Sequence, residues 1–176
     1  MKLKKAIVGA AIVAILAFLG VFALKTVFPL KYSDAIDRYA EEFDLSEELL
    51  MGVIYAESGF DPYAHSGKAC GLMQITDETA KWIAEKMSIG YYDEMLEEPE
   101  VNIRMGSYYL AYLIDYYNNT ETALAAYNAG MGNVSGWLKD REYSEDGITL
   151  KEIPYGETKR YVERVRKLQK LYEILY

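Results

Sequence analysis

The hydrophobic residues of this chain form one uninterrupted apolar run near the amino terminus and then recur in stretches with three- and four-residue spacing. That spacing is typical of helices that bury one face and expose the other. It predicts helices over residues 33–44, 46–57, 76–87, 99–116, 120–128 and 158–175, with a further helical turn over 134–139. Residues 140–156 are polar and rich in turn formers, so we expect an irregular surface excursion there. The sequence therefore predicts a mainly α-helical domain.

Several of these helices have recognisable starting residues. Ser33 and Thr76 are predicted N-caps, and Ser46, followed by two glutamates, begins the helix over 46–57. Thr120 is expected to cap the helix over 120–128, although Asn118-Asn119-Thr120 also matches a glycosylation sequon. The four residues 72–75 are too few to classify by period and fit a buried strand or turn.

The apolar run covers residues 6–24, which are 19 consecutive residues without a charge. As a helix it is long enough to cross the ~30 Å hydrocarbon core of a bilayer. A cleaved signal peptide is the alternative, but such peptides have a shorter apolar core and a small-residue cleavage site, and Leu24-Lys25-Thr26 provides none. We therefore expect a membrane anchor over residues 1–25, a short linker over 26–32 and one folded domain over 33–176.

The distribution of charge sets the expected orientation. Lys2, Lys4 and Lys5 precede the run, whereas Lys25 and Lys31 follow it, which favours the amino terminus inside and the domain outside. The expected location is thus the cell membrane, with a single pass and an extracytoplasmic domain. After residue 25 the chain carries 15 basic and 27 acidic side chains, a net charge of −12 that disfavours nucleic-acid binding.

The only cysteine, Cys70, cannot form an internal disulfide, so the core alone must hold an exported domain together. A Cys70/His65 nucleophilic pair is disfavoured, because an Ala-Cys-Gly context suits a small packed residue.

Glu57 is the most unusual acidic residue. Leu50, Val53 and Ile54 approach it with helical spacing, so Glu57 continues the buried stripe, and Gly59 then ends the helix. A carboxyl group in that place suits a cleft-lining acid. The alternative is a residue of the last helical turn that simply reaches solvent.

Four local patterns occur in a fixed order: Glu57-Ser58-Gly59-Phe60-Asp61-Pro62, Gly71-Leu72-Met73-Gln74-Ile75, Ala126-Tyr127-Asn128-Ala129-Gly130 and Pro154-x-x-Glu157-Thr158-x-x-Tyr161-Val162. Together with Asn102-Ile103, Gly106 and Tyr109-Leu110 they resemble the catalytic domain of the soluble lytic transglycosylases, a lysozyme-like family that acts on peptidoglycan. The resemblance covers roughly residues 33–172 and implies a lysozyme-like fold.

It also implies a reaction. A lytic transglycosylase cleaves the β-1,4 bond between N-acetylmuramic acid and N-acetylglucosamine of peptidoglycan strands, and the muramyl C6 hydroxyl, not water, attacks C1 to give a 1,6-anhydro product. By this resemblance Glu57 acts as general acid and then as base, with no metal or cofactor. Ser66, Met73, Gln74, Tyr127 and Tyr161 are the implied substrate-binding residues.

Some assignments have structural alternatives. Met73, Tyr127 and Tyr161 also suit core packing, and Asn128 suits a structural role as well as a substrate-binding one. Asp61 is expected to form a turn more than to act as a second acid. The segment 66–71 is one residue shorter than is usual in the family, and Asp77 stands where proline is common. Two other functions stay open: a muramidase-type hydrolase, and a non-catalytic glycan-binding scaffold associated with envelope-complex proteins.

Overall fold

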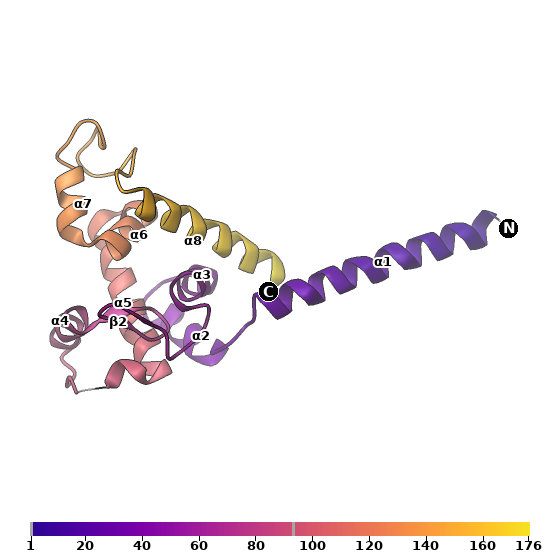
Figure 1. The fold of residues 1–176 in the computed structure, drawn as a ribbon, viewed down its shortest axis with the longest axis horizontal. Helices are drawn as coiled ribbons and strands as arrows, with labels where there is room; N and C mark the ends of the chain where they lie inside the picture. The colour runs from indigo at the N-terminus through magenta and orange to yellow at the C-terminus, as the bar shows by residue number, and fades with distance from the viewer. Residues whose placement is uncertain (1, 93) are drawn as a thin grey trace.

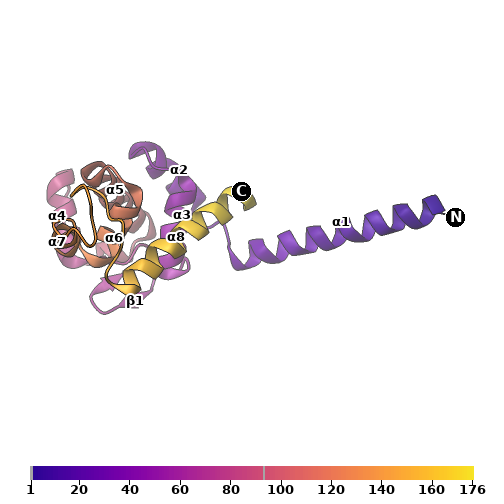
Figure 2. The same ribbon diagram turned by 90° about the horizontal axis from the view of Figure 1, so that it is seen from above.

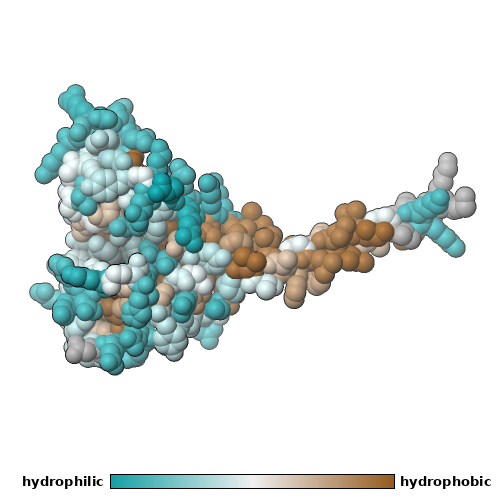
Figure 3. Space-filling view, viewed as in Figure 1, coloured by the Kyte–Doolittle hydropathy of each residue, from teal (hydrophilic) through white to brown (hydrophobic). Residues whose placement is uncertain are grey.

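A computed structural model describes residues 2–92 and 94–176. Helix α1 (Lys2–Val27) projects from a helical body as an isolated rod (Figures 1 and 2). Its segment Gly9–Val27 has 19 residues, a mean hydropathy of 2.4 and no buried share. Figure 3 shows this apolar surface along the rod. Among the described residues, α1 is the one helix that could cross a membrane by length and composition. Met1, the first residue of the predicted anchor, lies outside them.

The body contains the predicted helices, which confirms the mainly α-helical class. Their bounds are α2 (Ser33–Glu42), α3 (Glu47–Ser58), α4 (Asp77–Met87), η1 (Met95–Glu97), α5 (Pro99–Tyr117), α6 (Thr120–Ala129), α7 (Met131–Trp137) and α8 (Gly156–Leu175). Between α7 and α8 the described chain forms turns and bends, as expected for the excursion over 140–156.

A small antiparallel sheet lies between α3 and α4. Its strands are β1 (His65–Ser66), β2 (Ala69–Cys70) and β3 (Ile75–Thr76), in the order β1-β2-β3. Cys70 is the Cα partner of His65 on one side and of Ile75 on the other. Strands of two residues leave no periodic signal, so the pattern did not reveal the sheet.

Helix α3 lies in the core and packs along α8. Leu50, Val53 and Ile54 are fully buried, which confirms the predicted stripe. The two helices approach each other closely at Gly52, where an added Cβ atom would lie 3.1 Å from the Gln169 nitrogen and 3.1 Å from the Val165 oxygen. The close fit holds the end of α3, and with it Glu57, against α8.

The helix starts were predicted with mixed success. The Ser46 and Thr76 hydroxyls accept from the backbone N–H groups of Leu49 and Thr79, so both residues are N-caps. The Ser33 prediction is wrong, because Ser33 lies inside α2 and its hydroxyl donates to Asp34.

The predicted starts of α6 and α7 were also misplaced. Asn119, not Thr120, caps α6, since its side chain accepts from the Thr122 N–H at 2.9 Å. Helix α7 begins at Met131, three residues before the predicted turn, because Gly132 is accommodated within the helix and Gly130 alone interrupts the chain.

Candidate active site

A cavity of about 520 Å³, called the cleft below, lies between the end of α3, the small sheet and the start of α8. Its walls combine carboxyl, hydroxyl, amide and guanidinium groups. They are formed by Ala56, Glu57, Ser66, Ala69, Gln74, Thr76, Tyr127, Asn128, Glu157, Arg160, Tyr161 and Arg164. Five of the six residues that the sequence suggested, namely Glu57, Ser66, Gln74, Tyr127 and Tyr161, are thus brought together.

Glu57 lies in the last turn of α3. Gly59 ends the helix in the left-handed region, with φ of 62°, so the chain turns away and leaves the carboxyl group at the cleft. Ser58 fastens this end, because its hydroxyl lies 3.1 Å from the Ile54 carbonyl oxygen and 2.8 Å from that of Leu72. The acid is therefore held by a fixed helix terminus.

The environment of Glu57 disfavours its charge. Burial raises the pKa of Glu57 to about 7, while interaction with the Tyr161 hydroxyl and the charge of Arg164 lower it by smaller amounts. A carboxyl group with this pKa is protonated in a large fraction of molecules near neutral pH. It can therefore donate a proton and, once ionised, take one back.

The two tyrosines are held next to the acid from different helices. Tyr161 of α8 has a buried hydroxyl for which no partner of ordinary hydrogen-bond geometry exists among the described residues, and that hydroxyl interacts with Glu57. Tyr127 of α6 donates its hydroxyl to the Met73 carbonyl oxygen at 2.8 Å. Burial and the charge of Glu57 raise the pKa values of both tyrosines, so both remain neutral hydrogen-bond donors.

Met73 does not line the cleft, which corrects the prediction for its side chain. The side chain is fully buried, and an added Cβ on Gly106 would lie 2.3 Å from its sulfur atom. The contribution of Met73 to the site is its backbone, since its carbonyl oxygen accepts from Tyr127. Its N–H donates to the Asn102 side chain at 2.8 Å.

Gln74 follows in a strained turn, with φ of 48°. Its side-chain nitrogen donates to the carbonyl oxygens of Ala64 and Gly71 at 2.8 and 2.9 Å. These bonds tie the residue before β1 to the turn between β2 and β3, so Gln74 both lines the cleft and shapes it.

Asn102 was known from the sequence only as part of a motif, and its role becomes visible here. Besides accepting from Met73, its amide nitrogen donates to the Cys70 and Leu96 carbonyl oxygens at 3.1 and 2.9 Å. Gly71 gives it room, because an added Cβ there would lie 2.0 Å from that nitrogen. A single buried amide thus connects α5 to the cleft-lining turn.

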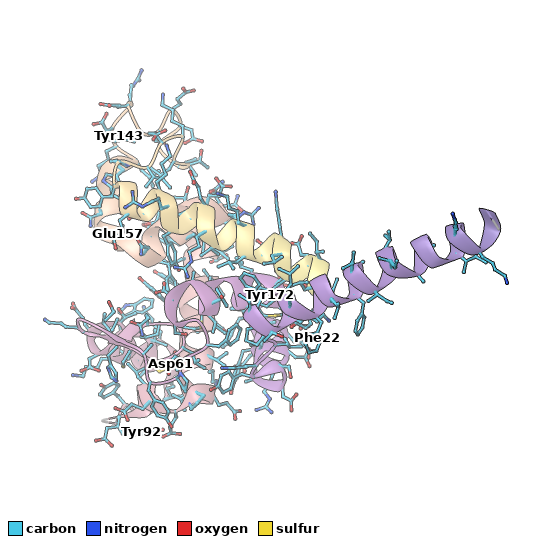
Figure 4. The ribbon with its side chains drawn as sticks, turned by 45° about the vertical axis from the view of Figure 1, so that its right-hand side comes forward. Phe22, Asp61, Tyr92, Tyr143, Glu157 and Tyr172 are labelled. Atoms are coloured by element: carbon cyan, nitrogen blue, oxygen red, sulfur yellow. The ribbon has the colours of Figure 1, made fainter. Side chains whose placement is uncertain are left out.

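Three charged residues of α8 line the cleft without having been predicted as site residues: Glu157, Arg160 and Arg164. Figure 4 places Glu157 at the amino-terminal end of α8. Their signal was present, because they lie within three or four residues of Tyr161 or of each other, on one side of a helix.

Asp61 is exposed, and its carboxylate accepts from the Tyr63 N–H at 3.0 Å, as expected for a turn residue. It does not line the cleft. Cys70 faces His65 across the hairpin, but burial raises the pKa of its thiol, which donates to Ile75, so the pair has no activated nucleophile. In the described part of the chain, no group of three or more His, Cys, Asp or Glu residues could hold a metal ion.

The fold and the cleft define a lysozyme-like helical domain with a single partly buried acid at its centre. The family model of the transglycosylase SLT domain matches residues 34–149. The chain belongs to this family.

The relatives support the same grouping. A soluble lytic murein transglycosylase of Salmonella typhimurium is 40% identical over 147 residues, covering 81% of this chain and 23% of the relative. A membrane-bound lytic murein transglycosylase C of Edwardsiella ictaluri is 31% identical over 172 residues, covering 81% of this chain and 46% of the relative. The chain therefore spans between about a quarter and half of the length of these two relatives.

Solved structures agree with the fold. The 70 kDa soluble lytic transglycosylase of Escherichia coli has a TM-score of 0.75 and 32% identity, covering 86% of this chain and 25% of that one. A complex of the 70 kDa soluble lytic transglycosylase with bulgecin A has a TM-score of 0.76 and 33% identity, with the same coverage of 86% and 25%. The Slt enzyme of Pseudomonas aeruginosa, solved as an inactive glutamate-to-glutamine variant, has a TM-score of 0.74 and 34% identity, covering 85% of this chain and 25% of that one.

Proposed function

We propose that this chain is a peptidoglycan lytic transglycosylase that cleaves the β-1,4 bond between N-acetylmuramic acid and N-acetylglucosamine. The observation that carries the proposal is the carboxyl group of Glu57, whose pKa is raised to about 7 at the wall of a 520 Å³ cleft. The activities named for the similar proteins point the same way.

In the first step the neutral Glu57 carboxyl donates its proton to the bridging oxygen, and the bond between that oxygen and muramyl C1 breaks. In the second step the muramyl C6 hydroxyl oxygen forms a bond to C1, and its proton passes to the Glu57 carboxylate. The acid is regenerated and no water is consumed, so one carboxyl group serves both steps. After the first step Glu57 is a carboxylate, and the charge of Arg164 and the Tyr161 hydroxyl favour this ionised form.

The remaining site residues position the strand in this proposal. Ser66, Gln74 and Tyr127 line the cleft, and Asn128, which also lines it, accepts from the Thr158 hydroxyl at 2.8 Å. Met73 acts through its carbonyl oxygen, which orients Tyr127. No metal or cofactor takes part in the proposed steps.

The test is digestion of purified, lipid-free peptidoglycan followed by mass spectrometry of the products. Ends of the 1,6-anhydromuramyl type support the proposal, and Glu57→Gln should remove all release. A Glu57→Gln protein with full activity would show that another residue is the acid. Glycan binding without cleavage by either protein would favour the non-catalytic scaffold.

Hydrolysis is the second candidate, and one observation favours it. Glu157 is a second carboxylate in the cleft, and a hydrolase needs such a group to activate water. Products with reducing ends, lost in Glu157→Gln, would establish a muramidase. Anhydro products that persist in Glu157→Gln would exclude that role for Glu157.

The membrane topology belongs to the same proposal. We infer that α1 crosses the cell membrane once and that the domain over residues 33–176 lies outside the cytoplasm. The unburied apolar segment Gly9–Val27 and the lysines before it support this arrangement. Protease added to intact spheroplasts should degrade the domain, and its complete protection would overturn the orientation.

A further inference from the structure

A second hollow, of about 540 Å³, runs along α8 toward the end of α1. We call it the α8 groove; it is lined by Phe28, Arg160, Glu163, Arg164, Lys167, Leu168 and Leu171. Arg160 and Arg164 line the cleft as well. The groove is therefore a continuation of the cleft, and the two hollows share two guanidinium groups.

The cleft-proximal part of the groove is cationic. Arg160, Arg164 and Lys167 follow one another at spacings of four and three residues, which places them on one side of α8. Within the described residues none of the three forms an ion pair, whereas Lys159 and Arg166 of the same helix pair with Glu152 and Glu121 at 2.7 and 3.9 Å. Glu163 is the one acid of the groove wall. A domain that is acidic as a whole thus has, among its described residues, three cations without an ion-pair partner beside its cleft, of which Arg164 also acts on Glu57 through its charge. Arginine suits phosphate oxygens in particular.

The other part of the groove is apolar. Its lining there consists of Leu168, Leu171 and Phe28, and Phe28 is the first residue after α1. From Tyr161 to Leu171 the helix rises about 15 Å. Figures 1 and 2 both show the carboxyl-terminal end of α8 next to the end of α1.

Hydrogen bonds hold this junction. The Tyr55 hydroxyl donates to the Val27 carbonyl oxygen at 3.2 Å, and the Tyr176 hydroxyl donates to that of Phe28 at 3.0 Å. The ammonium group of Lys25 lies 4.2 Å from the centre of the Tyr176 ring. The apolar end of the groove is thereby fixed where the apolar span ends.

Sugar-binding cleft, cations and apolar surface follow one another in the order of the parts of a lipid-linked glycan. We propose that the α8 groove binds the diphosphate of a glycan strand that is still attached to a membrane lipid, with Arg160, Arg164 and Lys167 on the phosphate oxygens. This substrate class rests on the proposed transglycosylase function. An ordinary phospholipid head group fits less well, because it carries no glycan that would place its phosphate beside the two arginines that also line the cleft.

The test uses the full chain in phosphatidylcholine nanodiscs and two substrates: a polyprenyl-diphosphate-linked uncrosslinked glycan, and the same glycan after release of its lipid diphosphate. Wild-type protein should cut the lipid-linked strand with the higher kcat/KM. Lys167→Gln should lower kcat/KM for that strand about tenfold, as expected for loss of one charge-assisted hydrogen bond. It should leave the lipid-free strand unaffected, since Lys167 lies outside the cleft.

Lys170→Gln is the matched control, because it removes the same charge from α8 outside the groove. Equal rates of wild type on both substrates would overturn the inference. So would an equal loss in Lys167→Gln and Lys170→Gln, which would indicate general attraction to the bilayer. If added phosphatidylglycerol abolishes the preference, the groove takes phospholipid head groups instead, and the inference is wrong.

A binding measurement separates this inference from the proposed function. Geranyl diphosphate is titrated into the Glu57→Gln full chain in nanodiscs by calorimetry, with and without Lys167→Gln, and inorganic diphosphate serves as the second probe. Saturable binding that needs Lys167 and the prenyl chain supports the groove even if no glycan is cut. Absence of binding overturns the groove even if lipid-free glycan is cut normally.

Discussion

Glu57 experiences one large and two smaller influences on its ionisation. Burial raises the pKa to about 7, and Tyr161 and Arg164 oppose it. If the reaction begins with proton donation, kcat/KM should be constant below this pKa and fall about tenfold per unit above it. A pH profile on lipid-free peptidoglycan measures this limb. A rate that rises through pH 7 would mean that the ionised form starts the reaction.

The same burial makes a prediction for stability. Because the pKa of Glu57 is higher in the folded state than in the unfolded state, the folded protein binds more protons between its ordinary value of 4.5 and about 7. Stability therefore falls as pH rises through this window, and the full cost above it is about 3 kcal/mol. Glu57→Gln should remove this cost.

The measurement is urea denaturation of the full chain in detergent at pH 4 and pH 8.5. Glu57→Gln should be more stable than wild type at pH 8.5, and the difference should shrink toward pH 4. A variant that is less stable at both pH values would show that the carboxylate is well solvated.

Tyr161 and Tyr127 make a matched pair of tests, since both line the cleft and each has one hydroxyl. The Tyr161 hydroxyl lowers the pKa of Glu57, so Tyr161→Phe should move the alkaline limb to higher pH. It should also lower kcat about tenfold, because the hydroxyl interacts with Glu57 and such an interaction with a charged group is worth roughly 1.5 kcal/mol once it forms in the reaction. Tyr127→Phe should shift the alkaline limb of the pH profile less than Tyr161→Phe does, since the Tyr127 hydroxyl donates to the Met73 carbonyl oxygen. Identical profiles for the two variants would refute separate roles.

At the residue scale the sequence indicated where the candidate acid, Glu57, lies but not all of its surroundings. The position of Glu57 was predictable because an apolar stripe led to it and a glycine ended its helix. The Met73 side chain was wrongly predicted to line the cleft. A turn of four residues has no hydrophobic periodicity that distinguishes side chains facing the cleft from those facing the core. Arg160 and Arg164 follow from helical spacing to Tyr161, but cations on an exposed helix face ordinarily indicate only solvation.

Among the elements, the contact between α3 and α8 matters most for the site, because α3 carries Glu57 and α8 carries Tyr161. Gly52→Ala would place a Cβ atom 3.1 Å from two backbone atoms of α8, which cannot move like a flexible side chain. We expect a loss of about 1 to 3 kcal/mol in the free energy of unfolding. Activity should also fall at a temperature where the variant is folded, since α3 and α8 must move apart and Glu57 then moves away from Tyr161.

Gly132→Ala is the control for this prediction. Gly132 lies inside α7 with open space around it, so alanine should stabilise the protein by about 0.5 to 1 kcal/mol through helix propensity alone. Denaturation midpoints and kcat of both variants test whether α3 and α8 are closely packed at Gly52. If Gly52→Ala behaves like Gly132→Ala, the helices are not closely fitted at this point.

The helices were predictable because each buries one face, and hydrophobic spacing records that burial directly. The sheet was not, since β1, β2 and β3 have two residues each and are held by a hairpin and by Asn102 from α5. A side-chain cap explains the misplaced start of α6. Both Asn119 and Thr120 have an oxygen that can accept at a helix start, and only the backbone geometry decides which one does.

At the scale of the whole molecule, the described part of α1 is joined to the helical body but does not share its core. None of the core residues comes from the described part of α1, and the first residue that packs against the core is Phe28. The hydroxyl contacts to Val27 and Phe28 fix the direction of the joint without adding to the core. Removal of α1 should therefore change the location of the protein far more than its fold.

A variant that begins at Phe28 tests this separation. The full chain should stay in the membrane pellet after alkaline carbonate and high salt and be released only by detergent, since its span Gly9–Val27 has a mean hydropathy of 2.4 and is unburied. The shortened protein should be soluble. Its unfolding free energy should lie within about 1 kcal/mol of that of the full chain, because only exposed contacts are lost. Release of the full chain by carbonate would show that α1 does not span the bilayer, whereas an unfolded variant would show that α1 supports the body.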